Sequence, residues 1–300
     1  MPRTLLFGTL LLLALGLSAC QSGAALAPLP QWQGPQGREH AELGQIRELS
    51  TGRLLTPEQL VRRLAAAPRV LVGEQHDNPD HHALQLWLLR ALEQQRPQGS
   101  LLLEMLEPAQ QARVDALKQQ PTLPVDLVSA LHWQSGWDWA LYGPIVRHAL
   151  GQPYPLLAAN LDRAEVRDIY RQVPKLEGQH ATTAAVTQAL LDQVREGHCG
   201  LLPESQMPAM LAVQQQRDRR IAQRLMQAPT PALLLAGAYH VRNDLGVPLH
   251  LLDLGVEQGT SVLMLAQVGE KVDAGMADYV WFTAGVAEQD YCASLRKGGW

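Results

Sequence analysis

The chain has 300 residues, of which 46% are hydrophobic, 18% are charged and 5% are aromatic. This composition excludes a collagen-like, low-complexity or wholly disordered protein. The formal net charge is −4, with lysine and arginine spread along the chain, so the basic surface that nucleic acid requires is missing. A chain of this length can bury one large core or two smaller ones.

The first 19 residues have the pattern of an export signal. A single positive residue, Arg3, precedes an apolar run from Leu5 to Leu17, which is too short to cross about 30 Å of hydrocarbon as a helix. The run ends in Leu-Ser-Ala-Cys, which resembles the lipobox of bacterial lipoproteins. We therefore expect residues 1–19 to be a lipoprotein signal peptide and Cys20 to carry the lipid anchor, for example palmitate. The alternative is a plain secretory signal with an incidental cysteine.

The residue after Cys20 is glutamine rather than aspartate, which by the lipoprotein sorting rule implies the periplasmic face of the outer membrane. Residues 20–45 are rich in Gly, Pro, Ala and Gln and are predicted to form a tether before a domain at 46–300. The other two cysteines, Cys199 and Cys292, could pair in the periplasm or remain unpaired and buried.

Short apolar segments alternate with helical patterns through the rest of the chain. Several of these segments are apolar on both faces, which is typical of central parallel strands covered by helices on two sides. Strands are predicted at Arg69–Gly73, Ser100–Leu103, Tyr154–Ala159, Ala232–Ala236, Ser261–Ala266 and Asp278–Phe282, and helices at Pro57–Ala66 and Asp80–Gln95. The predicted fold class is therefore α/β, with a mostly parallel central sheet and helices on both faces.

Two of the intervals between predicted strands are too long for a single connecting helix. Both have helical patterns, which in the second interval cover Asp162–Gln172, Thr182–Glu196 and Glu204–Gln227. We expect a smaller inserted helical subdomain at approximately 106–152 and 162–228.

Ionisable or amide side chains follow four of the predicted strands. A Gly-x-x-His sequence ends two of them, at Gly73 and at Gly237, where glycine allows a sharp turn and a close approach of the backbone to a ligand. In an open α/β sheet the carboxyl ends of the strands line one crevice. The side chains expected to converge there are those of Glu74, His76, Glu104, Asn160, Arg163 and His240.

Two imidazoles and two carboxylates can hold a divalent metal or share acid and base roles on a substrate. The candidate metal ligands are Glu74, His76 and His240, and the candidate catalytic residues are these three with Glu104 and Arg217. Taken singly, each histidine could simply be hydrogen-bonded, and Glu104 could cap a helix.

Two further polar features lie on predicted helices. His81 and His82 fall in a first helical turn, where the helix dipole favours neutral rings. In the last long helix the apolar stripe is interrupted by Arg217 and Asp218, which must meet polar partners if buried. Either the two form an internal network, or Arg217 reaches the crevice and faces an anionic ligand.

Several segments together resemble the ChaN family of iron-regulated, haem-binding lipoproteins of bacterial haem uptake. They are GEQHDNPDHH, LLLEM, DWALYGPIV, LAANLDR, HCGLLPESQMPAM with QQQRDRRIA, and GAYHVRNDLGVP. The paired Gly-x-x-His and the glutamate after the second strand are also similar to the wider Tiki/TraB and erythromycin-esterase superfamily, which includes metal-dependent hydrolases.

The resemblance implies haem held in a homodimer, with a tyrosine phenolate on iron and the haem propionates met by basic groups of the partner subunit. Of the six tyrosines (Tyr142, Tyr154, Tyr170, Tyr239, Tyr279 and Tyr291), we select Tyr142, which shares a helical face with Trp139 in a family-like segment. The alternative is that both aromatic residues belong to the core. Asn160 and Arg163 are the other expected haem contacts.

Two functions of different class follow from these observations. The first is a lipid-anchored periplasmic haem-binding protein that takes up, stores or transfers haem. The second is a metal-dependent hydrolase, a protease or an esterase, that uses the Glu/His crevice. A ligand-binding protein that retains an ancestral catalytic crevice would reconcile the two.

Overall fold

A computed structural model describes residues 25–287 and 289–296 of the chain. The expected signal peptide and Cys20 lie outside these residues. None of the described helices is long and apolar enough to cross a membrane.

The described residues form one eight-stranded sheet with the order β2-β1-β8-β7-β3-β6-β4-β5. The strands are β1 (Ile46–Glu48), β2 (Leu54–Leu55), β3 (Arg69–Glu74), β4 (Ser100–Leu103), β5 (Leu156–Ala158), β6 (Ala232–Gly237), β7 (Thr260–Gln267) and β8 (Tyr279–Thr283). From β8 to β5 every neighbouring pair is parallel, whereas β1 and β2 extend the β8 edge in antiparallel fashion. The mostly parallel sheet is thus confirmed.

Helices cover both faces of this sheet, and their termini follow local sequence signals. The helices are α1 (Pro57–Ala65), α2 (Pro79–Gln95), α3 (Gln111–Lys118), α4 (Leu127–Leu131), α5 (Trp139–Leu150), α6 (Arg163–Arg171), α7 (Ala184–Gly197), α8 (Met207–Gln227), α9 (Ala238–Val241), α10 (Val247–Asp253) and α11 (Tyr291–Arg296), with short 3₁₀ turns at Pro108–Gln110 and Glu204–Gln206. Thr56 and Asn78 cap α1 and α2, and each helix has proline in its first turn.

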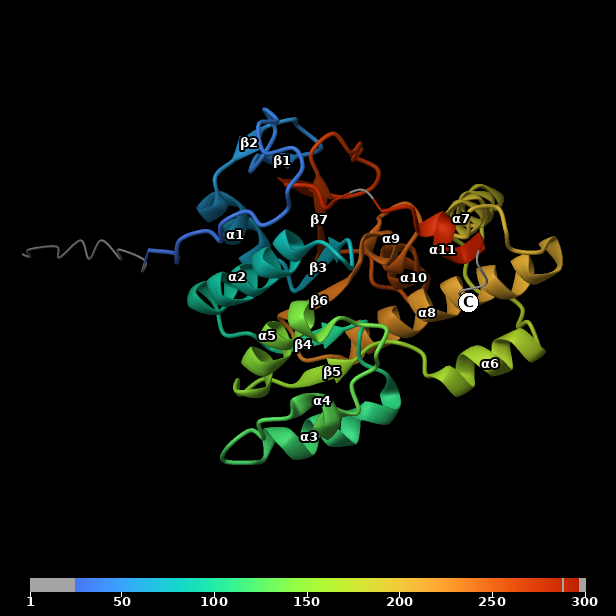
Figure 1. Cartoon of the computed structure of the whole chain (residues 1–300), viewed down its shortest axis with the longest axis horizontal. Helices are drawn as coiled ribbons and strands as arrows, with labels where there is room; N and C mark the ends of the chain where they lie inside the picture. Colours follow the sequence, from blue (N-terminus) through green and yellow to red (C-terminus); the bar gives the residue numbers. More distant parts are fainter. Residues whose placement is uncertain (1–24, 288, 297–300) are drawn as a thin grey trace, which may run out of the picture.

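Alternate residues of the central strands point to opposite faces and build two cores. Val70 and Val72 of β3 pack with α1, α2 and α5, whereas Leu71 between them packs with α8, α9 and α10. Figure 1 shows the sheet between these two groups of helices. This two-sided burial explains why the central strands are apolar along their whole length.

The two intervals expected to form the helical insertion behave differently. Residues 106–152 add side chains such as Val114, Leu131 and Tyr142 to the larger core, so α3, α4 and α5 cover the sheet rather than form a separate unit. In the second interval, α7 and the start of α8 build small cores of their own, around Leu190 and Val194. In Figure 1, α6, α7 and part of α8 project from the end of the molecule opposite α1 and α2.

The described part of the expected tether packs on the domain. The backbone amides of Gln33 and Gly34 donate to the two carboxylate oxygens of Asp80, at 2.6 and 3.0 Å, and Asp80 is buried at the start of α2. Trp87 Nε1 donates to the carbonyl of Ala27 over 2.8 Å. Ala27, Gln33 and Gly34 of the expected tether are therefore held against α2.

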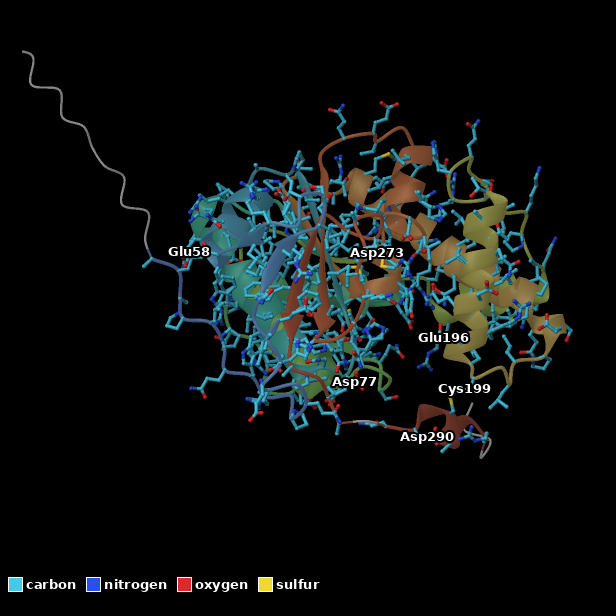
Figure 2. The ribbon with its side chains drawn as sticks, turned by 90° about the horizontal axis from the view of Figure 1, so that it is seen from above. Glu58, Asp77, Glu196, Cys199, Asp273 and Asp290 are labelled. Atoms are coloured by element: carbon cyan, nitrogen blue, oxygen red, sulfur yellow. A yellow bond between two sulfur atoms is a disulfide. The ribbon has the colours of Figure 1, made fainter. Side chains whose placement is uncertain are left out.

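A disulfide joins Cys199 and Cys292, whose Cα atoms are 5.7 Å apart. It links α11 to the turn that follows α7, on the side of the helical projection (Figure 2). The pairing that the sequence left open is thus present.

The Asp80 contacts give a test of how the N-terminal segment is held. Asp80→Ala removes the acceptor of two backbone amides, so we expect the free energy of unfolding to fall by about 1–3 kcal/mol. Amide exchange at Gln33 and Gly34 should also accelerate. Asp168→Ala, which changes an exposed carboxylate, is the control. Unchanged exchange at these two amides in Asp80→Ala would contradict the interpretation.

Candidate functional site

A cleft of about 810 Å³ lies at the carboxyl ends of β3, β4 and β6, facing α8. The sequence-predicted residues that line it are Glu74, His76, Glu104, Arg217 and His240. Glu74 ends β3, Glu104 follows β4, and His240 lies in α9 directly after β6. Because these strands are parallel neighbours, side chains separated by more than 150 residues meet at one edge.

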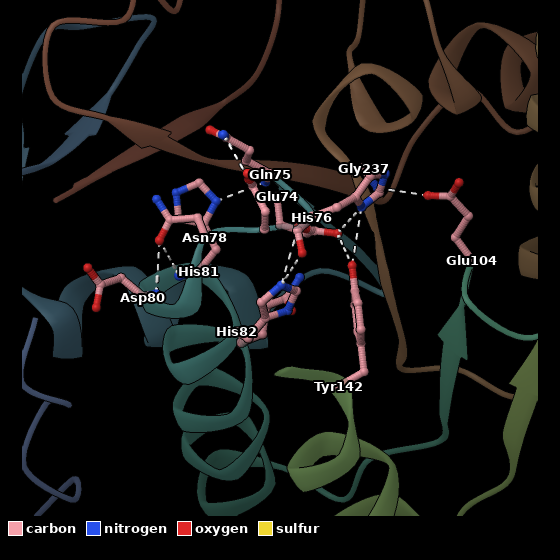
Figure 3. Close-up of polar contacts among 12 residues, drawn as sticks. Glu74, Gln75, His76, Asn78, Asp80, His81, His82, Glu104, Tyr142 and Gly237 are labelled. Carbon is pink, nitrogen blue, oxygen red and sulfur yellow. Dashed lines mark hydrogen bonds and ion pairs between the residues drawn. The ribbon is translucent and has the colours of Figure 1, made fainter. Parts of the chain in front are cut away.

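The carboxylate of Glu74 organises one wall of this cleft. Its Oε1 lies 2.6 Å from His76 Nδ1 and accepts the hydroxyl of Tyr142 over 2.9 Å. Figure 3 shows both side chains turned toward Glu74. Within the described residues, Glu74 Oε2 is buried without a hydrogen-bond partner, and His82 Nε2 lies 3.7 Å from it.

His76 is held at one ring nitrogen and open to the cleft at the other side. Burial opposes its protonation, but Glu74 outweighs burial and raises the pKa of His76 above its ordinary value. A Cβ added to Gly237 would lie 3.0 Å from His76 Nε2, so glycine here makes room for the ring. The ring also packs edge-on against Trp137, with centroids 4.8 Å apart.

Beneath the cleft, His240 lies between two buried carboxylates. Its Nδ1 is 2.5 Å from Asp218 Oδ1 and its Nε2 is 3.3 Å from Glu104 Oε1. Burial works against the charged ring, but Glu104 and Asp218 outweigh it and raise the pKa of His240 to about 10. Burial likewise opposes ionisation of Glu104, yet His240 brings the pKa of that carboxyl well below its usual range. The second oxygen of Glu104 accepts the backbone amide of Gly237 over 2.9 Å.

Arg217 lines the cleft. Of the two interpretations offered for the polar turn of α8, the one in which Arg217 reaches the crevice therefore describes its position. Its Nε donates to Asn160 Oδ1 over 2.9 Å, and Asn160 in turn donates to the carbonyl of Glu104 over 2.8 Å. Asp218 turns instead to His240. Arg163 does not line this cleft and lies in an adjoining cavity.

His81, one of the two helix-start histidines, is a structural residue. Its Nδ1 accepts the amide of Gln75 over 2.9 Å and its Nε2 lies 2.9 Å from Thr283 Oγ1. Burial, and then the neighbouring His82, lower the pKa of His81 to about 3. The expected neutral ring at this position is therefore confirmed, with burial as the main cause.

Two tyrosines near the cleft, Tyr142 and Tyr239, differ in how far they are buried. Tyr142, the predicted haem ligand, is 2% exposed, and burial together with Glu74 raises the pKa of its hydroxyl far above the ordinary value. Tyr239, which precedes His240, is 50% exposed and lines the cleft. The prediction also left out Asp218 as a site residue, although the polar interruption of α8 pointed to it.

The predicted metal set is not gathered as a metal centre. Among residues 25–287 and 289–296, no group of three or more His, Cys, Asp or Glu side chains is arranged to hold a metal ion. Both nitrogens of His240 already face carboxylates, which leaves no lone pair for a metal. His76, with Nδ1 oriented by Glu74 and its side chain 46% exposed, is the more accessible histidine of the set and lines the cleft.

Comparisons with known proteins agree with this architecture. The family model for "Haem-binding uptake, Tiki superfamily, ChaN" matches residues 60–251. The structure of ChaN of Campylobacter jejuni, solved for its cofacial haem binding, is 31% identical with a TM-score of 0.74, and the match covers 80% of this chain and 97% of that chain. No curated protein sequence matches this chain.

More distant structures share parts of the fold. An erythromycin esterase variant in its open conformation is 13% identical with a TM-score of 0.46, over 85% of this chain and 87% of that chain. A MARTX toxin effector domain from Vibrio vulnificus is 12% identical with a TM-score of 0.42, over 79% and 40% of the two chains. Neither likeness is close enough to support a functional inference.

The position of His240 between Glu104 and Asp218 predicts a specific dependence of stability on pH. A histidine whose pKa rises on folding, here from about 6.5 to about 10, stabilises the fold fully below pH 6.5. That stabilisation is lost as the pH rises toward 10. We expect the free energy of unfolding of the wild type to fall over this range, and His240→Gln to show a smaller fall.

At pH 7, His240→Gln should lower the free energy of unfolding by about 3–5 kcal/mol, because it leaves buried carboxylates without their counter-charge. Denaturant unfolding between pH 6 and pH 10 measures both effects. His40→Gln, at an exposed histidine, is the control. Equal pH slopes for wild type and His240→Gln would show that the ring is not protonated in the fold.

Proposed function

The chain belongs to the ChaN family of haem-binding uptake proteins, and on that premise we propose that it is a lipid-anchored periplasmic protein that binds haem for uptake, storage or transfer. The observation that carries the proposal is an exposed tyrosine at a cleft with an apolar wall. The matched region contains α8 and the cleft residues from Glu74 to Arg242, whereas the cleft residues from Met264 to Met276 follow it.

The residues that line the cleft fit a flat apolar macrocycle. The cavity of about 810 Å³ lies in the usual range for cofactor sites. Its apolar side chains are those of Trp137, Met264, Leu265, Val272 and Met276. Arg217 and Lys271 are cationic side chains at the cleft that suit the acidic groups of haem, whereas Arg242, also in the lining, is paired with Asp244.

Tyr239 replaces Tyr142 as the proposed axial ligand. A tyrosine that binds ferric iron must present its phenolate oxygen at the ligand surface. The hydroxyl of Tyr142 is buried and donates to Glu74, which holds the proton on the phenol. Tyr239 is half exposed and lies on the cleft, so its oxygen can approach the iron without repacking the core.

Asn160 and Arg163 have different places in this proposal. Asn160 is a positioning residue, because it holds Arg217 Nε at the cleft and touches no cleft surface itself. Arg163 belongs to the adjoining cavity.

The homodimer and the membrane location are further parts of the proposal. The relative from Campylobacter jejuni binds haem cofacially, and the resemblance implies two subunits around the haem. The Leu-Ser-Ala-Cys sequence followed by glutamine supports a lipid on Cys20 and the outer membrane as the location.

One observation favours a second candidate, a hydrolase. His76 has its Nδ1 fixed by the buried carboxylate of Glu74, and its half-exposed side chain lines the cleft, which suits a general base. Arg217 at the same cleft could stabilise developing negative charge. This candidate requires no metal, unlike the version expected from the sequence.

The haem proposal predicts a spectrum that depends on one tyrosine. We expect the purified full-length protein to bind ferric haem with the visible charge-transfer band of a phenolate ligand. Tyr239→Phe should lose this band because the ring remains but the ligand oxygen does not. Absorption titration with haem measures both the band and the affinity.

Tyr142→Phe is the matched control, since it removes a tyrosine hydroxyl from the same region. It should keep the phenolate band and lose stability instead, by about 1–3 kcal/mol, because Glu74 loses a buried donor. A band that disappears in Tyr142→Phe and persists in Tyr239→Phe would reverse the assignment.

The anchor is tested by Cys20→Ala. Without a lipidated cysteine we expect the protein to leave the outer-membrane fraction and to lose palmitate labelling, since no described helix spans a membrane. Fractionation and metabolic labelling of cells that express each form measure this. An unlabelled wild type that is recovered in the soluble fraction would reject the lipoprotein assignment.

The hydrolase candidate is tested on the haem-free protein with an activated ester such as p-nitrophenyl acetate. We expect any turnover to fall about 100-fold or more in His76→Ala, as for loss of a general base, and to persist in Tyr239→Phe. Turnover that survives His76→Ala would exclude His76 as the base.

A further inference from the structure

A second cavity of about 480 Å³ adjoins the cleft on the side of α6. Trp137 and Arg217 line both cavities and so form the boundary between them. The other polar side chains of the second cavity are those of Glu107, Gln134, Asn160, Asp162, Arg163 and Arg167. Three guanidinium groups therefore face one small space.

Arg217 is fixed at this boundary. Asn160, which is 7% exposed, accepts Arg217 Nε with the same oxygen that accepts the amide of Leu161. Its amide nitrogen is tied to the carbonyl of Glu104. A buried amide with both ends bonded leaves Arg217 little freedom, so this guanidinium is presented to both cavities in one position.

Arg163 and Arg167 lie one turn apart on α6 and add two more cations. Within residues 25–287 and 289–296, no carboxylate lies within 4 Å of either guanidinium, whereas nearby Arg171 and Arg220 each form an ion pair. Both arginines are exposed and line the second cavity. Neighbouring cations without close counter-charges form a site that an anion would stabilise.

The two acidic side chains of the second cavity offset these cations only in part. Asp162 Oδ1 accepts the amides of Ala164 and Glu165 as the N-cap of α6, so it serves the helix. Glu107 is the other carboxylate of the described lining; burial raises its pKa above the ordinary value, although the charge of Arg163 opposes this rise. Three guanidiniums against two carboxylates leave the second cavity with a net positive charge.

We propose that the second cavity is a carboxylate-binding subsite, in which Arg163 and Arg167 act with Arg217 at the boundary with the cleft. A guanidinium presents paired N–H donors that match the two oxygens of a carboxylate. The carboxylate has two sources, an acidic side chain of a ligand seated in the cleft or a free small acid. The first source rests on the proposed haem binding, whereas the second does not.

The variants Arg163→Glu and Arg167→Glu test this subsite in the purified full-length protein. Arg171→Glu is the matched control, because it reverses a charge on the same helix and lines none of the cavities described above. The probes are ferric haem, haem with both carboxyl groups esterified, and succinate. Absorption titration measures the two haem affinities, and calorimetry measures succinate binding.

If the carboxylate belongs to the haem, Arg163→Glu and Arg167→Glu should each weaken haem binding about tenfold or more. The same variants should leave the affinity for esterified haem within about twofold. If the source is a free acid, the two variants should abolish succinate binding and leave both haem affinities unchanged. Either pattern supports the subsite and identifies its ligand.

Equal affinities of all three variants for every probe would overturn the subsite. A wild type that binds neither form of haem but binds succinate through Arg163 and Arg167 would reject the proposed function and keep the subsite. The opposite outcome is a wild type that binds haem, does not bind succinate, and keeps its haem affinity in Arg163→Glu and Arg167→Glu. It would reject the subsite and keep the proposed function. Circular dichroism of each variant checks that α6 remains folded.

Discussion

The burial of three ionisable side chains in one contact, Glu104 with His240 and Asp218, is the constraint on which the site depends. A buried charge is tolerated only where partners of opposite charge meet it with good geometry. Here the three groups come from the end of β4, from α9 and from the middle of α8. Their contact therefore joins the long helix to the strand ends at the base of the cleft.

The same contact decides which residues remain free for chemistry. His240 has both ring nitrogens beside carboxylates, so it can neither bind a metal nor take a proton from a substrate near neutral pH. Glu104 is similarly committed, to His240 and to the amide of Gly237. The side chains that remain available to a ligand are the accessible ones that line the cleft, among them His76, Trp137 and Tyr239. A cleft with a buried ion-paired base and accessible side chains around its opening suits a protein that binds a large ligand.

The sequence predicted what depends on regular periodicity and missed what depends on packing direction. The central strands are apolar on both faces, so their ends, and hence the meeting of Glu74, Glu104 and His240, could be anticipated. Strands β1 and β2 have three and two residues, too few for any period to show. Residues 106–152 looked like an insertion because spacing along the chain does not reveal whether helices return to the sheet.

The choice among the tyrosines depends on packing direction in the same way. Tyr142 lies on an apolar helix beside Trp139, a pattern shared by an aromatic ligand platform and by an ordinary core face, and α5 turned out to present the core face. Tyr239 lies on α9, which has four residues, too short for a pattern to indicate which side chain is buried. The polar interruption of α8 indicated that Asp218 meets a polar partner, but helix periodicity alone does not identify that partner as His240 of α9.

The Gly-x-x-His sequence at β6 therefore has two separate tasks in adjacent residues. His240 is 7% exposed and turns inward to the carboxylates, whereas Tyr239 is 50% exposed and turns to the cleft. Because His240 makes the buried contacts, Tyr239 can be substituted without loss of the contact between His240 and the two carboxylates. At β3 the equivalent histidine, His76, is instead 46% exposed at its side chain and held by Glu74 from below. One tetrapeptide thus produces a buried histidine at one strand and an accessible imidazole at the next: His76 contacts one buried acid, Glu74, whereas His240 lies between two, Glu104 and Asp218 of α8.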